Sequence, residues 1–126
     1  MNKEDVVNPV AGKRIDITEV KDALFSKKLL GDGFAVIPEN NDICSPVDAE
    51  ILTITQTKHA IGLKAQDGTQ ILIHIGLDTV KLNGEGFEAF VSAGDKVSKG
   101  QKLVSFDYKL AAEKGFDPAV IVCFPA

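Results

Sequence analysis

Short apolar stretches recur along the chain, separated by glycine, proline and aspartate. Several are rich in valine, isoleucine and phenylalanine, and a few alternate apolar with polar residues. Stretches of this length, bounded by turn residues, are typical of β-strands. The pattern predicts strands near Val10 to Ile17, Phe34 to Ile37, Val47 to Thr55, His59 to Ala65, Gln70 to Ile75, Phe87 to Val91, Lys102 to Phe106 and Ala119 to Phe124.

Helical patterns are few and short. One helix is expected around Asp22 to Ser26 and another around Tyr108 to Lys114, the second ending at Gly115 in the C-cap position. Because no long amphipathic helix is present, a parallel α/β sheet is disfavoured. The pattern predicts an all-β fold, an antiparallel β-sandwich or barrel-like structure with one or two short helices. No linker is visible, so residues 1–126 are expected to form a single domain.

Composition and charge fit a small globular protein. The chain is 44% hydrophobic and 25% charged, with a net charge of −4. This acidic balance argues against nucleic acid and anionic membranes as partners, and favours a neutral or basic one. The N-terminus has no apolar signal region and no stretch is long enough to span a membrane. A cytoplasmic protein is therefore expected.

The two cysteines, Cys44 and Cys123, lie far apart in the sequence and in no metal-type spacing. Isolated cysteines of this kind usually behave as small, partly buried apolar residues. Both are expected to be reduced, with no redox role.

The chain has two histidines, His59 and His74, and both fall in one predicted β-hairpin. Asp67-Gly68 between two apolar stretches is a strong hairpin signal. If these two residues form the loop, Ile61 faces His74, His59 faces Gly76, and Thr57 faces Asp78. Side chains on a strand alternate between faces, so this register predicts a shared face. Its members are Thr57, His59, Ile61, Leu72, His74 and Asp78.

In this register the two histidines are diagonal neighbours, with Cα atoms roughly 7 to 8 Å apart. Imidazole titrates near neutral pH and can act as nucleophile, proton donor or metal ligand. A phosphoryl-accepting histidine needs one free ring nitrogen, donors for the phosphate oxygens and room for a partner. His59 is a candidate donor to a phosphate on His74, Thr57 could orient His59, and Gly76 removes bulk beside the pair.

Three other functions are open. His59, His74 and Asp78 could supply three ligands to a catalytic zinc, although no H-x-H or H-E-x-x-H spacing is present. The segment from Gly94 to Gln101 is similar to the half-motif of biotinyl or lipoyl carriers, but the only methionine is Met1. A regulatory module that binds partners according to its phosphorylation state is compatible with the phosphoryl-acceptor hypothesis.

Five segments, in order, resemble the signature of the glucose-type IIA domain of the phosphoenolpyruvate-dependent sugar phosphotransferase system. The resemblance runs from about Asn8 onward and is most specific between His74 and Phe87. The segments are Gly31-Asp32-Gly33, Ser45-Pro46-Val47-Asp48, Thr57-x-His59-Ala60, Ile73-His74-Ile75-Gly76-Leu77-Asp78-Thr79-Val80 and Leu82-x-Gly84-Glu85-Gly86-Phe87.

The resemblance implies a β-sandwich of the duplicated hybrid-motif type and a phosphoryl relay. The phosphocarrier protein HPr would donate to His74, which would pass the group to a cysteine of the IIB domain of a sugar permease. His59 would stabilise the phosphorylated state, Thr57 would bond to His59, and Gly76 and Asp78 would support the site. No cofactor is required by this relay, although zinc at the two histidines is credible. Membrane association would come only through the permease.

The resemblance also implies an apolar docking surface, with matching positions at Phe25, Leu29, Leu30, Leu72 and Val80. Thr55 departs from the family, because a large aromatic residue is expected there. The family also continues beyond the equivalent of Ala126 to a closing strand, so either this chain is shortened or its sheet lacks an edge strand. The segment from Glu113 to Val122 looks more like domains fused to β-glucoside or sucrose permeases than like the separate glucose-specific protein.

Overall fold

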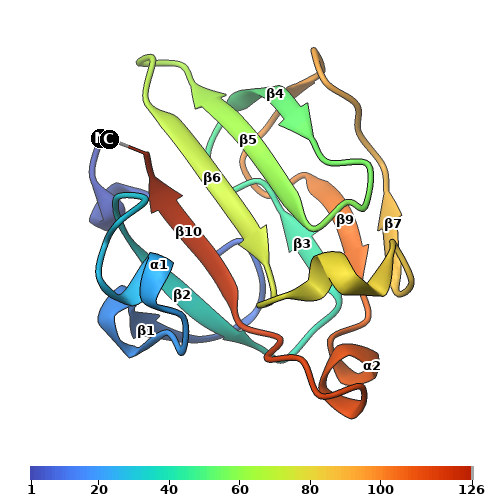
Figure 1. Ribbon diagram of the computed structural model, residues 1–126. Coiled ribbons are helices and arrows are strands. Elements are labelled where there is room, and N and C mark those ends of the chain that lie inside the picture. Colours follow the sequence, from blue (N-terminus) through green and yellow to red (C-terminus); the bar gives the residue numbers. More distant parts are fainter. Residues whose placement is uncertain (126) are drawn as a thin grey trace.

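The computed structural model describes residues 1–125 and contains two antiparallel β-sheets packed face to face (Figure 1). The resemblance to a β-sandwich with few helices is confirmed. The larger sheet has the strand order β1 (Gly12–Asp16), β2 (Asp32–Pro38), β10 (Val120–Phe124), β6 (Gln70–Ile75), β5 (Ala60–Ala65), β4 (Ala49–Ile54) and β8 (Lys96–Val97). The smaller sheet has the order β3 (Asp42–Cys44), β9 (Lys102–Phe106) and β7 (Phe87–Ala89).

All eight predicted strands are present, with ends that move by a few residues. The sequence pattern missed two strands, β3 and β8. Each has a single fully buried residue, Ile43 in β3 and Val97 in β8, between exposed or half-buried neighbours. One apolar position is too little to produce a periodic signal.

The main core lies between the two sheets, and a second, smaller core lies on the outer face of the larger sheet. The central strand β10 contributes to both, since Val120 and Val122 face the main core while Ile121 and Cys123 face the smaller one. Burial on both faces explains why this strand is a continuous apolar run. The smaller core is covered by α1 (Ala23–Ser26), which lies across β10 and β2 in Figure 1.

Both predicted helices are confirmed. Asp22 caps α1 by accepting a hydrogen bond from the amide of Leu24. The second helix, α2 (Tyr108–Glu113), is capped by Asp107 and is followed by Gly115 at a φ of 88°. Three 3₁₀ turns complete the described chain: η1 (Lys3–Asp5), η2 (Ile17–Glu19) and η3 (Thr79–Leu82).

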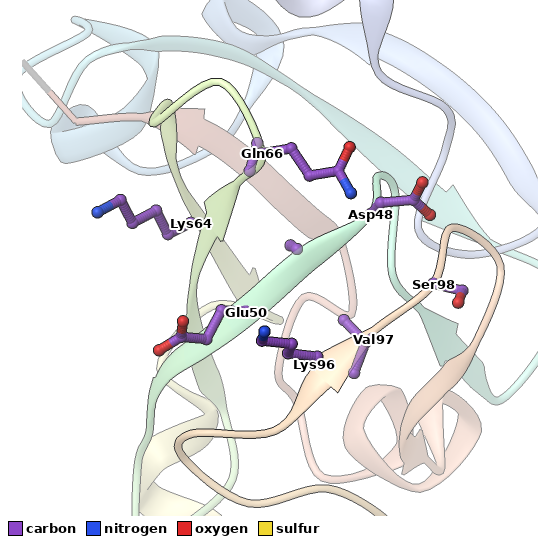
Figure 2. Close-up of a pocket in the computed structure, with 9 residues that line it drawn as sticks. Asp48, Glu50, Lys64, Gln66, Lys96, Val97 and Ser98 are labelled. Carbon is purple, nitrogen blue, oxygen red and sulfur yellow. The ribbon is translucent and has the colours of Figure 1, made fainter.

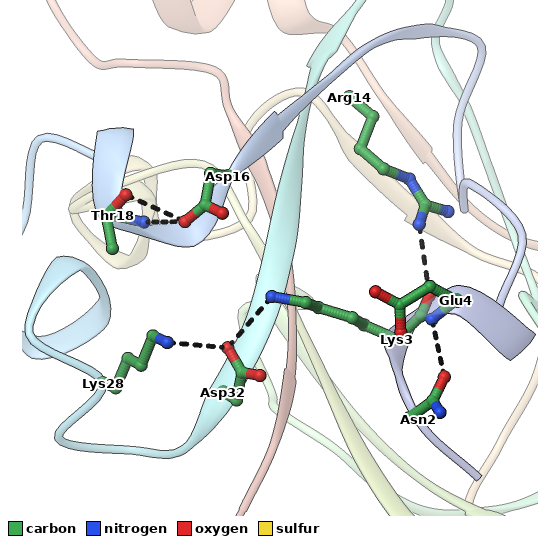
Figure 3. A network of polar contacts seen from close by, with 8 residues as sticks. All are labelled: Asn2, Lys3, Glu4, Arg14, Asp16, Thr18, Lys28 and Asp32. Atoms are coloured by element: carbon green, nitrogen blue, oxygen red, sulfur yellow. Dashed lines mark hydrogen bonds and ion pairs between the residues drawn. The ribbon is translucent and has the colours of Figure 1, made fainter.

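An exposed polar network ties the first residues to the segment that follows α1 (Figure 3). The carboxylate of Asp32 lies 3.4 Å from Nζ of Lys3 and 3.5 Å from Nζ of Lys28. The guanidinium of Arg14 donates to the backbone carbonyl of Lys3 at 3.1 Å. Exposed ion pairs of this kind add little stability individually.

The β5–β6 hairpin corrects the predicted register. Ala60 pairs with His74 and Ile61 pairs with Ile73, one residue away from the expected pairing. The amide of Ala65 donates to the carbonyl of Thr69, which leaves a loop of Gln66-Asp67-Gly68 in place of Asp67-Gly68 alone. Gly68 has a φ of 91°, as expected for a three-residue loop that ends in a left-handed residue.

The register change moves one residue of the predicted shared face. Ile61 is fully buried and belongs to the main core, whereas His74 and Leu72 point to the outer face of the sheet. The prediction that Ile61 shares a face with His74 is therefore wrong. A one-residue slip exchanges the two faces of a strand, and the extra loop residue causes that slip.

Both cysteines are free thiols, as expected. Cys44 is half-buried, and Cys123 is buried in the smaller core. Burial raises the pKa of the Cys123 thiol to about 11, so it is protonated at neutral pH.

Candidate functional site

His74 lies near the end of β6 on the outer face of the large sheet. Its Nδ1 atom is 2.7 Å from the carbonyl oxygen of Gly76. A carbonyl oxygen only accepts hydrogen bonds, so Nδ1 must carry the proton of the neutral ring. The lone pair is then on Nε2, and this is the nitrogen that can attack an electrophile.

Gly76 is held in a conformation that other residues adopt at a cost. Its φ is 79°, and its amide donates to the carbonyl of Ala119 at 2.9 Å. A Cβ atom at this position would lie 2.4 Å from the side-chain methyl of Thr79. Glycine is therefore required here for backbone shape and for space against Thr79, while the expected role of Gly76 in leaving room beside the histidines stays a prediction.

His59 lies just before β5, in the turn that joins β4 to β5. Lys58 has a φ of 64°, and its amide donates to the carbonyl of Thr55. This left-handed residue redirects the chain, so His59 does not follow the alternation of the strand. The position of His59 therefore comes from the turn, and the register argument that predicted it was wrong.

Two threonine hydroxyls approach Nδ1 of His59. Oγ1 of Thr57 is 2.5 Å away and Oγ1 of Thr55 is 3.3 Å away. Thr55 also accepts a hydrogen bond from the amide of Ala60. When a threonine hydroxyl donates to Nδ1, the proton of the neutral ring is on Nε2, where it can be donated to a phosphate oxygen. Thr57 thus contacts the ring that it was predicted to contact. Thr55 is an additional contact, at a position that the sequence marked only as a departure from the aromatic residue expected in the docking surface.

The two imidazole rings are in contact. Their centroids are 5.3 Å apart and their planes are inclined at 77°. The predicted proximity of His59 and His74 is therefore confirmed by the geometry, although the backbone route to it differs from the expected one. The ring of Phe25 packs on His74 as well, with a centroid distance of 5.2 Å.

Both histidines have a lowered pKa. Burial lowers the pKa of His74, while the Gly76 carbonyl and the carboxylates of Asp22 and Asp78 partly offset this effect. For His59 the causes are burial and then the adjacent His74. Both rings are thus neutral at neutral pH, which is the state that a nucleophilic imidazole requires.

Asp78 is exposed and begins η3 in a left-handed conformation, with a φ of 60°. It favours the charged form of His74 through its own charge and makes no side-chain cap bond to η3. Asp22, the residue that caps α1, acts on His74 in the same way and was not predicted. Its only sequence signal was the N-cap position.

The predicted docking residues differ in their exposure and fall into three groups. Leu29, Leu30 and Val80 are exposed, at 65%, 38% and 46%. Leu72 is half-buried against the smaller core. Phe25 is only 3% exposed, so its expected place on an exposed surface is wrong, because the side chain turns inward beneath His74.

One further exposed residue extends this group. Leu24, beside Phe25 in α1, is 50% exposed and was missed. These exposed apolar residues come from α1, which contacts His74 through Phe25, from the segment after α1, and from η3, which follows the strand of His74. We refer to Leu24, Leu29, Leu30 and Val80 as the apolar rim.

The hypothesis of a three-ligand zinc site finds no support in the geometry. Within residues 1–125, no group of three histidine, cysteine, aspartate or glutamate residues is placed to hold a metal ion. His59, His74 and Asp78 therefore do not form the expected ligand set. Zinc bound by the two histidines alone stays a prediction.

A separate hollow of about 480 Å³ lies between β4, β5 and β8 (Figure 2). Its charged side chains alternate in sign, because Glu50 pairs with Lys64 on one side and with Lys96 on the other. Neither histidine lines it. Residues of opposite charge at facing positions of neighbouring strands are typical of an exposed sheet surface, and they account for this hollow without a ligand.

The fold and the site together define a small antiparallel β-domain that presents a histidine with a fixed tautomer, in contact with a second histidine, on the outer face of its larger sheet. The chain matches, over residues 4–126, the family described as phosphoenolpyruvate-dependent sugar phosphotransferase system, EIIA 1. It belongs to this family, which confirms the resemblance and places the chain among the phosphotransfer components of that system.

Known relatives agree with this assignment. The chain is 52% identical over 113 residues to a PTS system glucose-specific EIIA component of Bacillus cereus, covering 90% of this chain and 68% of the relative. It is 47% identical over 116 residues to a PTS system beta-glucoside-specific EIIBCA component of Bacillus subtilis, covering 92% of this chain and 19% of the relative. The expected likeness of the segment from Glu113 to Val122 to domains fused to β-glucoside or sucrose permeases stays a prediction.

A solved structure has the same fold. Glucose permease IIA from Mycoplasma capricolum superposes with a TM-score of 0.89 at 43% sequence identity, covering 96% of this chain and 79% of that one. In residues 1–125, no helix has the length and apolar character needed to cross a membrane.

Proposed function

We propose that this chain is a phosphocarrier that accepts a phosphoryl group from phosphorylated HPr on Nε2 of His74 and passes it to a cysteine of a IIB domain. The observation that carries the proposal is the bond from Nδ1 of His74 to the Gly76 carbonyl, which leaves Nε2 as the nucleophilic nitrogen. Family membership supplies the chemical context.

The transfer has two steps. In the first, the lone pair of Nε2 attacks the phosphorus atom, and the bond from phosphorus to the donor breaks with its electron pair returning to the donor. In the second, the thiolate of the IIB cysteine attacks the same phosphorus, and the bonding pair of the N–P bond returns to Nε2. Phosphoryl transfer needs mostly alignment and charge stabilisation, so a fixed ring orientation is the main contribution of the protein.

His59 supplies the charge stabilisation. Its Nδ1 is engaged by Thr57, so its Nε2–H is free to donate to a phosphate oxygen on His74. The contact between the two rings supports this role, because a phosphate on His74 falls within reach of His59. His59 is thus a donor to the phosphorylated state, while His74 is the nucleophile.

The apolar rim is the proposed docking surface for both HPr and the IIB domain. Exposed apolar residues around a polar centre are typical of protein-binding surfaces. A relative of this chain is an EIIBCA component, and this supports a IIB domain as the acceptor. Association with the membrane would then come through the permease, and the chain itself would be cytoplasmic.

The test is phosphorylation in vitro with phosphoenolpyruvate, enzyme I and HPr. The wild-type chain should take up one acid-labile phosphate, and His74→Ala should take up none. His59→Gln should still accept phosphate but pass it to IIB at least about tenfold more slowly, since it loses a charge-stabilising donor. Undiminished uptake by His74→Ala would overturn the proposal.

A further inference from the structure

Thr79 is unusual because it is polar and completely buried. Among the described residues, only Ser45 shares this property. The hydroxyl of Thr79 donates to the carbonyl of Ile75 at 2.5 Å, four residues back along the chain. Thr79 therefore links the start of η3 to the last residue of β6. The segment between these two residues contains Gly76.

The Ile75 carbonyl needs this partner because β5 has already ended beside it. The amide of Ile75 donates to the carbonyl of His59 at 2.7 Å, so the carbonyl of Ile75 points to the same side of the strand. In a regular hydrogen-bonded pair of antiparallel strands, the amide of His59 would in turn donate to the carbonyl of Ile75. The turn at Lys58 diverts the chain at this point, and the Thr79 hydroxyl occupies the acceptor instead.

The next peptide unit carries the carbonyl that fixes the ring of His74. Gly76 donates its amide to Ala119 and accepts the Nδ1–H of His74. The methyl group of Thr79 also lies against Gly76, at the position that a Cβ would occupy. Thr79 thus contacts this short segment twice, once through a hydrogen bond and once through packing.

We propose that Thr79 is a positioning residue, whose buried hydroxyl sets the backbone at Ile75–Gly76 and thereby holds His74 in the tautomer with a bare Nε2. The catalytic importance of this tautomer rests on the proposed phosphocarrier function. The positioning itself does not, because the tautomer can be measured on the free chain.

Without the hydroxyl, the buried Ile75 carbonyl has lost its donor. Leaving such a group unpaired is costly, so the Ile75–Gly76 backbone shifts toward another donor, within the limits set by the bond from the Gly76 amide to Ala119, and this shift displaces the adjoining Gly76 carbonyl. The bond to Nδ1 then lengthens, and the second tautomer of His74 becomes populated. The expected change in the tautomer ratio is about tenfold, which corresponds to the loss of one buried hydrogen bond.

The experiment compares Thr79→Val with Thr79→Ser by ¹⁵N NMR of the imidazole nitrogens at a pH where both histidines are neutral. Valine keeps the shape and removes the hydroxyl, whereas serine keeps the hydroxyl. The wild type and Thr79→Ser should show Nδ1 of His74 protonated, and Thr79→Val should show a mixture of tautomers. Thr79→Ala against Thr79→Ser gives a second comparison that differs by the hydroxyl alone.

Ser45→Ala is the matched control, because Ser45 donates its buried hydroxyl to the carbonyl of Val47 at 2.6 Å, outside this segment. It should lower the melting temperature without changing the His74 tautomer. An unchanged tautomer in folded Thr79→Val, or a mixture in Thr79→Ser equal to that in Thr79→Ala, would overturn the proposal. Failure of the wild type to accept phosphate would contradict the proposed function and leave the tautomer comparison intact.

Discussion

His59 and His74 meet edge to face, with ring centroids 5.3 Å apart and planes inclined at 77°. The two rings differ in what holds them: a backbone carbonyl accepts from His74, whereas threonine hydroxyls engage His59. A carbonyl forces the proton onto Nδ1, but a hydroxyl can also donate to Nδ1. This difference in partners supports the unequal roles proposed for two chemically equal side chains, His74 as nucleophile and His59 as donor.

Thr57→Val is expected to slow transfer to IIB by about tenfold and to affect acceptance from HPr much less. Valine retains the shape of threonine and removes the hydroxyl that is 2.5 Å from Nδ1 of His59. Single-turnover rates, measured separately for acceptance from HPr and for transfer to IIB, would distinguish the two effects. Thr57→Ser should behave as the wild type. An equal decrease in the rates of both steps in Thr57→Val would contradict an action through His59.

The stability of the chain should fall as the pH is lowered below about 6.5, the ordinary pKa of an unfolded histidine. Both histidines have a lowered pKa in the folded state, so the unfolded chain binds protons more readily in the window between the folded pKa and 6.5. The free energy of unfolding therefore decreases through this window and is constant just above it. Urea denaturation at a series of pH values would measure the slope.

The double variant His59→Gln with His74→Gln is the control for this slope, which it should remove. Carboxylates with a lowered pKa, such as Asp16 and Asp32, cause a separate loss of stability only near pH 4 and below. A slope that persists near pH 6 in the double variant would assign the effect to other groups.

Gly76→Ala should destabilise the fold by more than the roughly 1–3 kcal/mol that a left-handed conformation costs a non-glycine residue. The added Cβ would lie 2.4 Å from the methyl of Thr79 in addition to this strain. Gly94→Ala is a matched control, because its φ is 93° and its Cβ would meet open space. Chemical denaturation of both variants would isolate the steric part, and equal losses would show that space at Gly76 is not limiting.

Removal of metal should leave phosphoryl acceptance unchanged. Within residues 1–125 no third ligand joins the two histidines, and the proposed transfer uses only protein groups. The assay should use phosphorylated HPr that has been purified away from enzyme I, so that a chelator acts on this chain alone. Loss of acceptance on chelation, restored by zinc, would favour a metal-dependent reaction instead.

Much of the fold could be predicted because local patterns determine it. The eight strands, both helices and the C-cap at Gly115 follow from apolar runs and turn residues. The register of the β5–β6 hairpin could not be predicted, since the same sequence is compatible with a two-residue loop, Asp67-Gly68, and with a three-residue loop, Gln66-Asp67-Gly68. The additional loop residue moved Ile61 into the core.

The site was predicted only in part, because the sequence shows the residue types but not how turns and packing place them. His59, His74 and Thr57 were found by residue type and by resemblance, but the turn at Lys58 that places His59 has no distinctive sequence pattern. Phe25 was assigned to the docking surface by resemblance to the family, and only the three-dimensional packing reveals that its side chain turns inward. Thr79 was included only as part of the segment from Ile73 to Val80. Its buried hydroxyl could not be predicted, because burial depends on residues distant in sequence.

The placement of β10 has a consequence for how this domain is made. Residues 120–124 form a central strand between β2 and β6, and Ile121 pairs with His74. During synthesis, the strand that carries His74 is therefore complete long before its neighbour has left the ribosome. Since such distant pairings form late, we expect a nascent chain of residues 1–119 to lack the ordered pair of His59 and His74. This pair would form only after residues 120–124 have been added and have joined the sheet.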